Sequence, residues 1–175
     1  RICIDRGIEI SGSDIKNSTT LEALALRGGT IHIGHQPSNL GAAQTVVISS
    51  AIKESNPELK AAREQGIVVV GRAQALATLL NGYTSIAIAG THGKTTTTSM
   101  LTIALQNLGW DPSFAIGGTP HDSRSNSHHG QGLHFVVEAD ESDGSFIEYN
   151  PFAAIVTNVE HDHVDFFPTP ESVAQ

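Results

Sequence analysis

The stretch SIAIAGTHGKTTTTS, residues 85–99, combines a short apolar run, a glycine-containing loop and a row of hydroxyl side chains. The apolar run, Ser85–Ala89, contains branched residues without a helical period, which predicts a buried strand. After the loop, apolar residues recur at helical spacing, at Leu101, Leu105 and Leu108. Gly109 then follows, as a helix C-cap would. We therefore expect a strand, a tight loop and a helix, in that order.

The loop between this strand and this helix has the chemistry of a phosphate-binding site. Its amides and the helix N-terminus would face an anion, Lys94 would add a positive charge, and the Thr95 hydroxyl would hold Mg²⁺. The standard pattern G-x-x-x-x-G-K-[ST] is not matched, because Ile88 occupies the position of its first glycine. The predicted phosphate-binding residues are Gly90, Thr91, His92, Gly93, Lys94, Thr95 and Thr96.

The alternative is a glycine turn followed by a chance lysine. The strand and the helix on either side favour phosphate binding instead, and so does the threonine run at residues 95–98. Threonine is a poor helix former. A run of it at a helix start makes most sense where hydroxyls face phosphate and metal. The sequence therefore predicts a nucleotide site.

Composition narrows the classes of protein. The 175 residues carry a formal net charge of −8, with no basic stripe, which argues against a nucleic-acid partner. No apolar stretch approaches the roughly 18 residues that a membrane helix needs, and no signal peptide opens the chain. The single cysteine, Cys3, excludes an internal disulfide and fits a reducing compartment. The first residue is Arg1, so a processed or truncated start stays open.

Strand and helix patterns alternate along the first half of the chain. We expect strands at 8–10, 30–34, 45–49 and 67–70, and helices ending at Gly7, spanning 19–27, running from Asn56 to Gly66, and spanning 72–80. This βαβ rhythm implies a parallel sheet covered on both faces. The turn cluster Asn81–Tyr83 is the best domain boundary.

Two polar residues of this half have alternative interpretations. Asp14 follows an early strand, where dinucleotide-binding folds hold ribose hydroxyls, but the glycine-rich loop that should precede it is absent. Asp14 therefore either caps the following turn or belongs to a domain whose start lies upstream. His35 is either an ordinary loop residue or a ligand contact.

The second half adds strands at 113–118, 134–140 and 153–158, with a polar loop at 119–132. Glu138 lies within a strand beside valines, where a bare carboxylate would be costly. Near a phosphate loop, such an acid most naturally holds nucleotide Mg²⁺, although a solvated acidic loop is the plain alternative for residues 138–143.

Histidines form two further groups. The spacing H-x-H-x-D at 161–165 is similar to that of dinuclear zinc hydrolases, but Phe166 stands where those enzymes usually have histidine. A histidine beside the γ-phosphate, acting through a second Mg²⁺, fits the phosphate loop better. His128 and His129 either form a metal pair or, as is commoner for adjacent histidines, are solvated.

Taken together, these motifs resemble the Mur ligases, and the resemblance covers the whole chain. The segments that carry it are GTHGKTT at 90–96, EADESD at 138–143 and TNVEHDHVD at 157–165. In the first half they are SGSD at 11–14, Gly34-His35, and SSAI at 49–52 ahead of Asn56-Pro57. Within the family, Ser142 favours a member that adds L-alanine, because the murein tripeptide-recycling ligase typically has tyrosine there.

The resemblance implies a role for each matching residue. Lys94 would neutralise the β,γ-phosphates of ATP. Thr95 and Glu138 would share one Mg²⁺, and His163 would bind a second. These three, Lys94, Glu138 and His163, are the implied catalytic residues. The implied contacts to the UDP part of the substrate are Ser13, Asp14, His35 and Ser50.

The implied fold is α/β: a Rossmann-like parallel-sheet domain at 1–83, without its start, and the first part of a P-loop α/β ATP-binding domain at 84–175. The implied reaction is ATP-dependent amide-bond formation between L-alanine and UDP-N-acetylmuramate in the bacterial cytoplasm. The resemblance also implies an upstream glycine-rich loop and a third domain after Gln175, so we expect a fragment that is inactive alone. Residues 126–128 depart from the family pattern, which often has a basic residue there. A non-catalytic nucleotide-binding module and a simple ATPase are the other candidates.

Overall fold

A computed structural model describes residues 1–118, 125–140, 145–160 and 169. The chain divides into two compact units, Arg1–Ala75 and Leu76–Gln175. The boundary expected at residues 83 and 84 stays a prediction.

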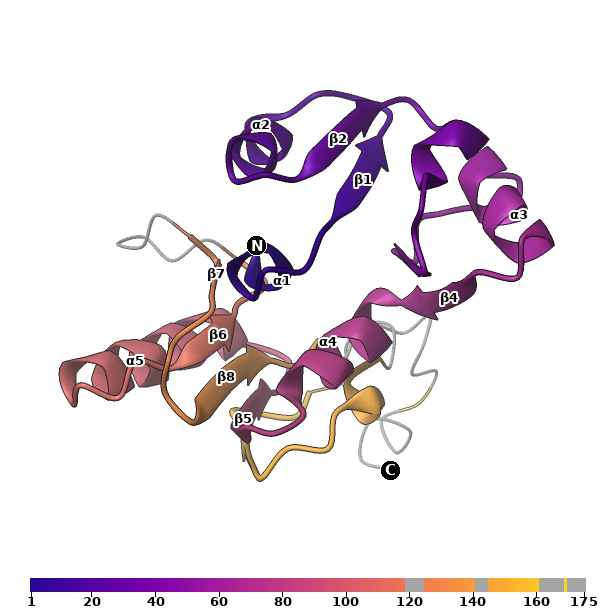
Figure 1. The fold of residues 1–175 in the computed structure, drawn as a ribbon. Coiled ribbons are helices and arrows are strands. Elements are labelled where there is room, and N and C mark those ends of the chain that lie inside the picture. The colour runs from indigo at the N-terminus through magenta and orange to yellow at the C-terminus, as the bar shows by residue number, and fades with distance from the viewer. Residues whose placement is uncertain (119–124, 141–144, 161–168, 170–175) are drawn as a thin grey trace. The chain divides into compact units, whose positions relative to one another are not determined.

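The first unit is built from short strands and helices in alternation (Figure 1). In chain order its elements are α1 (Ile2–Asp5), β1 (Ser11–Asp14), α2 (Thr19–Leu26), β2 (Thr30–Ile33), the 3-10 helix η1 (Pro37–Leu40), β3 (Thr45–Ile48), α3 (Pro57–Glu64) and β4 (Val68–Gly71). Strand β1 pairs in parallel with β2, and β3 pairs in parallel with β4. The α/β class with parallel strands is thus confirmed, although these strands form two pairs rather than one sheet.

The first strand lies three residues later than the sequence suggested. The short alternation at 8–10 predicted a strand, but the ladder runs from Ser11 to Asp14, opposite Thr30–Ile33. Ile10 only accepts a backbone hydrogen bond from Thr30 ahead of the ladder, and Ile8 is half exposed. Pairing with β2 therefore determines where the strand lies, and the alternation of Ile8 and Ile10 does not. Asp14 becomes its last residue.

Capping residues fix the helices where the sequence placed them. Ser18 accepts a hydrogen bond from the Leu21 amide at the start of α2. Asn56 accepts from the amides of Glu58 and Leu59 at the start of α3, with Pro57 in the first position. Gly66, with φ of 69°, ends that helix in the left-handed region. Buried Leu40, Ala61 and Ala62 then form the centre of a small core.

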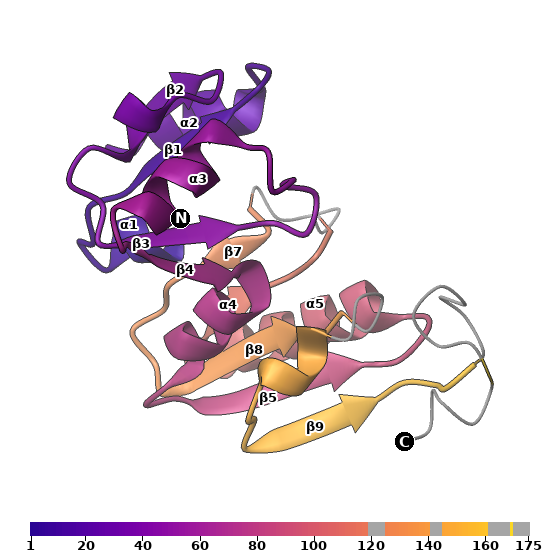
Figure 2. The same ribbon diagram turned by 90° about the vertical axis from the view of Figure 1, so that its right-hand side faces the viewer.

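The second unit contains a five-stranded sheet. Helix α4 (Arg72–Leu80) leads into it, and its elements are β5 (Thr84–Ala89), α5 (Lys94–Asn107), β6 (Ser113–Ala115), β7 (Ser127–His128), β8 (His134–Glu138), the 3-10 helix η2 (Ser145–Glu148) and β9 (Ala153–Val156). The strand order is β7-β6-β8-β5-β9, and only β7 runs antiparallel to its neighbour. Figure 2 shows β8, β5 and β9 side by side. Strand β7 and the two 3-10 helices carried no sequence signal that we recognised.

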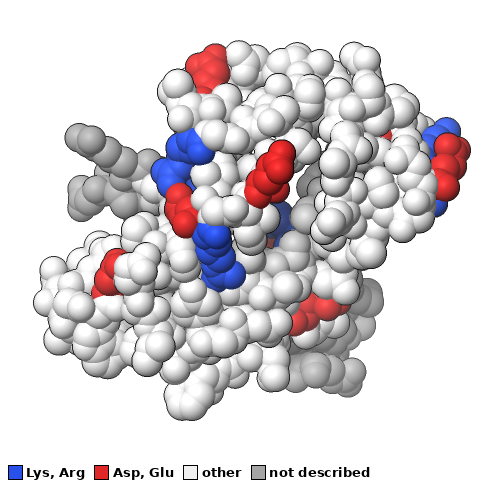
Figure 3. All heavy atoms as spheres, in the orientation of Figure 1, with Lys and Arg blue, Asp and Glu red and all other residues white. Residues whose placement is uncertain are grey.

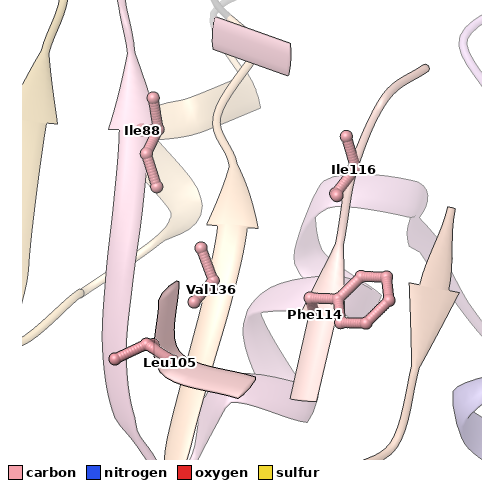
Figure 4. Close-up of a cluster of buried hydrophobic side chains, with 5 residues drawn as sticks. All are labelled: Ile88, Leu105, Phe114, Ile116 and Val136. Atoms are coloured by element: carbon pink, nitrogen blue, oxygen red, sulfur yellow. The ribbon is translucent and has the colours of Figure 1, made fainter. Parts of the chain in front are cut away.

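The core of this unit lies where α5 packs on β8 and β5. Its buried cluster comes from three adjacent strands and the helix (Figure 4): Ile88, Leu105, Phe114, Ile116 and Val136. Ile88 and Val136 have no exposed surface. The strand and helix that flank the predicted phosphate loop are therefore fixed by the same core.

The described surface agrees with the composition. On the face shown in Figure 3, basic side chains lie in small groups among acidic ones and form no continuous basic surface. Within the described ranges, none of the helices is both long enough and apolar enough to cross a membrane.

Candidate functional site

The loop that follows β5 turns sharply and opens directly into α5. Gly90 has φ of 122° and Gly93 has φ of 82°, both in the region that favours glycine. Gly93 is the residue before the first helical residue, Lys94, and no side chain caps that end. The positive end of the dipole of this 14-residue helix therefore lies at the loop, as a phosphate cradle requires.

Lys94 lies against the loop. Its ammonium group donates to the carbonyl oxygen of Gly90 at 2.7 Å and to that of Thr91 at 3.3 Å. The loop backbone thus holds the positive charge close to the amides of the helix start. This placement concentrates positive potential at the end of β5.

Glu138 reaches the same place from the neighbouring strand. It pairs with Ile88 in the parallel ladder of β5 and β8. Its carboxylate accepts the Thr95 hydroxyl at 3.0 Å and the Gly117 amide at 2.9 Å. A Cβ atom on Gly117 would lie 2.9 Å from the Glu138 carboxylate, so a larger residue there would make that side chain shift. The sequence prediction that Thr95 and Glu138 act together is consistent with this geometry.

A hydroxyl and a carboxylate at hydrogen-bond distance are the kind of oxygen ligands that Mg²⁺ takes when it also binds phosphate oxygens. Few protein ligands suffice, because Mg²⁺ keeps several waters. The part of the chain that the structure describes contains no group of three or more His, Cys, Asp or Glu side chains able to hold a metal. The Thr95 hydroxyl and the Glu138 carboxylate fit Mg²⁺ that is delivered with a nucleotide.

The threonine run is only partly directed at the site, which corrects the sequence interpretation. The Thr98 hydroxyl donates to the Lys94 carbonyl at 2.8 Å, and Thr98 is fully buried. Ser99 and Thr102 make the same bond to the carbonyl four residues earlier. These hydroxyls satisfy the helix backbone from within the core. The hydroxyls of Thr98, Ser99 and Thr102 are thus bonded to the helix backbone.

The end of β9 holds the phosphate loop from the other side. Asn158 accepts from the His92 amide at 2.9 Å and donates to the His92 carbonyl at 3.3 Å. The Thr157 hydroxyl donates to the same carbonyl at 2.6 Å. The Thr91 amide donates to the Asn158 carbonyl oxygen. The sequence placed Thr157 and Asn158 in a motif but did not predict this role. The available signal was that both residues directly follow the parallel strand β9.

A second polar group lies in the first unit, at the carboxyl ends of β1 and β2. Ser13 contacts His35 Nδ1 at 2.9 Å and donates to the Glu58 carboxylate at 2.5 Å. Asn39 also donates to Glu58, at 2.6 Å. The structure thus brings together the predicted residues Ser13 and His35. It adds Glu58, in the first turn of α3, which the sequence did not connect with them.

The Glu58 carboxylate is held in its ionised form. Burial opposes ionisation, but hydrogen bonds from Ser13, Asn39 and the Gln36 amide outweigh it, so the pKa of Glu58 lies below its ordinary value. The proximity of His35 acts in the same direction.

Asp14 and Ser50 are less engaged. Asp14 is exposed, and its carboxylate accepts a hydrogen bond from the Lys16 amide at 3.3 Å. This contact is the one expected if Asp14 caps the turn that follows β1. Its carbonyl accepts from the Gly34 amide at 2.7 Å, next to His35. Ser50 is exposed in the turn after β3 and takes no part in the hydrogen bonds that join Ser13, His35 and Glu58.

His128 and His129 have different partners. His128 Nε2 lies 3.3 Å from the Asp111 carboxylate, and His129 Nδ1 lies 3.3 Å from the Ser113 hydroxyl. Hydrogen bonding by the Gln131 amide and then His128 lowers the pKa of Asp111 against a small opposing effect of burial. These contacts explain both histidines without a metal.

His163 and the rest of 161–165 lie outside the described residues, as do residues 141–143 and residues 119–124 of the polar loop. Their predicted roles stay predictions.

Comparison with known families identifies both parts of the chain. Residues 1–84 match the description "Mur ligase family, catalytic domain", and residues 88–175 match "Mur ligase middle domain". Among curated proteins, the UDP-N-acetylmuramate–L-alanine ligase of Mycolicibacterium smegmatis is 52% identical over 98% of this chain. That of Renibacterium salmoninarum is 51% identical over 100%. The chain spans only 37% and 38% of their lengths.

Solved structures give the same result. The UDP-N-acetylmuramate–alanine ligase from Thermotoga maritima superposes with a TM-score of 0.88, at 28% identity over 98% of this chain and 40% of that one. The UDP-N-acetylmuramate:L-alanyl-γ-D-glutamyl-meso-diaminopimelate ligase from Neisseria meningitides gives 0.87, at 30% identity over 98% of this chain and 59% of that one.

Proposed function

Since this chain belongs to the Mur ligase family, we propose that it forms the nucleotide-binding part of an ATP-dependent ligase. That ligase joins L-alanine to the lactyl carboxylate of UDP-N-acetylmuramate, a step of peptidoglycan precursor synthesis in the bacterial cytoplasm. Relatives at 50–52% identity carry this activity in their names. The solved ligases for L-alanine and for the longer peptide substrate are 28% and 30% identical, so the choice of L-alanine rests on the curated relatives.

One observation supports the proposal most. Glu138 accepts a hydrogen bond from Thr95, which directly follows Lys94, and the Lys94 ammonium is held by the loop backbone. The first step brings together two anions, because a carboxylate attacks the γ-phosphate of ATP. Such a step depends on positive charge and positioning rather than on a covalent nucleophile. The Lys94 ammonium and the N-terminus of α5 would supply that charge.

Thr95 and Glu138 would hold Mg²⁺, and His163 would hold a second ion. Bound Mg²⁺ neutralises charge on the phosphate oxygens during transfer. Glu138 keeps the Thr95 hydroxyl and the Gly117 amide in place. Thr157 and Asn158 keep the loop closed around the β5 end.

The chemistry then follows from the substrates. Transfer of the γ-phosphoryl group to the lactyl carboxylate gives an acyl phosphate and ADP. The amine of L-alanine attacks the activated carbonyl carbon, and phosphate leaves. The group Ser13, Asp14, His35 and Ser50 would bind the UDP part of the acceptor.

The test is phosphate release by the full-length protein with ATP, UDP-N-acetylmuramate and L-alanine. We expect release to require all three. Lys94→Ala should reduce turnover at least a thousandfold while UDP-N-acetylmuramate binds as before, and Lys60→Ala, a charge change on exposed surface of α3, should leave both unchanged. Phosphate release that does not need the amine would support an ATPase instead.

Residues 1–175 alone are a separate case. The chain covers under two fifths of its curated relatives. We propose that it binds nucleotide but does not turn over by itself. Turnover by this piece in the same assay would contradict that view.

A further inference from the structure

The hydrogen-bonded group Glu58, Ser13 and His35 draws on three segments that are distant in sequence. Ser13 lies on β1, His35 follows β2, and Glu58 lies in the first turn of α3. The side chains of His35 and Glu58 are only 16% and 15% exposed. Such enclosure restricts how the imidazole can rotate.

The proton positions in this group follow from counting donors. An ionised carboxylate only accepts, so the single Ser13 proton must point at Glu58, over a distance of 2.5 Å. Ser13 Oγ can then only accept from His35 Nδ1, which lies 2.9 Å away. His35 Nδ1 therefore carries a proton. In the neutral ring, Nε2 is left with a lone pair.

The carboxylate itself is fixed through its other oxygen. Glu58 Oε1 accepts from Asn39 Nδ2 at 2.6 Å and from the Gln36 amide at 3.1 Å. Asn39 also donates to the Gly34 carbonyl at 3.0 Å, which ties the loop carrying His35 to the same acid. Position in the first turn of α3 further favours negative charge.

We propose that Glu58 is a positioning residue of the sugar-nucleotide site. It acts through Ser13 to hold His35 as the Nδ1–H tautomer, so that Nε2 accepts a hydrogen bond from a hydroxyl or N–H group of the substrate. The inference rests on the proposed function for the identity of that substrate. The location agrees with it, because the carboxyl ends of parallel strands are where such folds bind ligands.

Glu58→Gln makes a sharp test. The amide oxygen can still accept from Asn39 and Gln36, which leaves the amide NH₂ to face Ser13. Ser13 Oγ must then accept from the amide, and its own proton turns to His35 Nδ1. The substitution therefore predicts a reversal of the tautomer to Nε2–H. Glu64→Gln, on the exposed end of the same helix, is the matched control.

The measurement is long-range ¹H–¹⁵N NMR of the histidine rings in the full-length protein, above the titration range of histidine. Signals of His35 are assigned by their loss in His35→Gln. We expect Nδ1–H in the wild type and in Glu64→Gln, and Nε2–H in Glu58→Gln. The wild-type spectrum decides the tautomer even if Glu58→Gln fails to fold.

Ligand binding completes the test. UDP-N-acetylmuramate should shift the Nε2 signal of the wild type, and its Kd should rise about tenfold or more in Glu58→Gln, the scale of one lost hydrogen bond. The KM for ATP and kcat at saturating substrate should not change. A purely structural role would instead raise the Kd and the KM for ATP and lower kcat together.

Two negative results are distinguishable. Nε2–H in the wild type, or an unchanged tautomer in Glu58→Gln, would overturn the inference whatever binds. A wild type with the expected tautomer that fails to bind UDP-N-acetylmuramate would overturn the proposed function, and with it the ligand assigned to Nε2.

Discussion

Gly90 marks the point where the phosphate loop and the end of β9 come closest. A Cβ atom there would overlap the Thr157 hydroxyl oxygen and lie 2.8 Å from the Asn158 carbonyl oxygen. Its φ of 122° also disfavours any side chain. Thr157 and Asn158 are the residues that hold the loop, so crowding at residue 90 acts directly on the site.

Gly90→Ala should therefore weaken ATP binding by the full-length protein at least tenfold and lower its Tm. Gly109→Ala is the matched control, because Gly109 also has positive φ, 76°, but has no atom within 4 Å of an added Cβ. The control should lower stability by about 1 kcal/mol and leave ATP affinity unchanged. Isothermal titration with ATP and Mg²⁺ measures the ATP affinity of the two variants, and thermal unfolding measures their Tm. Equal losses of affinity in the two variants would show that backbone strain alone, not crowding, is responsible.

Glu58 also makes a prediction about acid stability. Its pKa is lowered from an ordinary value of 4.5, so its contribution to stability is present above that pH. The contribution is lost as the pH falls through the folded-state pKa. The wild type should thus exceed Glu58→Gln in free energy of unfolding near neutral pH, with the difference shrinking below pH of about 4.5. Urea unfolding at several pH values measures this, and a pH-independent difference would contradict it.

At the scale of elements, the site depends on adjacent parallel strands ending together. Strands β8, β5 and β9 deliver Glu138, the phosphate loop and Asn158 to one edge of the sheet. Helix α5 closes that edge, and the buried cluster of Ile88, Val136 and Leu105 holds it there. The arrangement at this edge thus depends on strand register rather than on any single motif.

Asn158→Ala should loosen the loop without unfolding the sheet. It removes the two side-chain bonds to the His92 backbone, at 2.9 and 3.3 Å, but leaves the backbone bond between Thr91 and Asn158. We expect ATP affinity to fall about tenfold, by roughly 1.4 kcal/mol, and amide exchange to quicken at residues 91–93. Asn107→Ala, at the far end of α5, is the control. Unchanged exchange in Asn158→Ala would remove Asn158 from this role.

At the scale of the whole molecule, the motifs were predictable because each depends on neighbours in sequence. The phosphate loop needs only a strand, two glycines and Lys94, and the cap at Asn56 needs only the next turn. The roles of Glu58 and Asn158 were not predicted because their partners, Ser13 and His92, lie 45 and 66 residues away in the sequence. The misplaced first strand has the same origin, since pairing with β2 outweighs two local isoleucines.

The threonine run shows that a local pattern can also suggest contacts that the fold does not make. Hydroxyls next to a phosphate loop suggested phosphate contacts, yet Thr98 is buried and bonds to its own helix. Which face of α5 meets the core is decided by the sheet it packs on, and a row of identical residues does not reveal it.

The central claim is that Lys94, Thr95 and Glu138 form one site for a nucleotide with its Mg²⁺. A crystal structure of the full-length protein with a non-hydrolysable ATP analogue and Mn²⁺ tests it, since anomalous scattering locates the metal directly. We predict a metal peak at coordination distance, about 2.0–2.2 Å, from both Thr95 Oγ1 and the Glu138 carboxylate, with the phosphates inside the loop at 90–96. A metal or a triphosphate bound away from these residues would contradict the account.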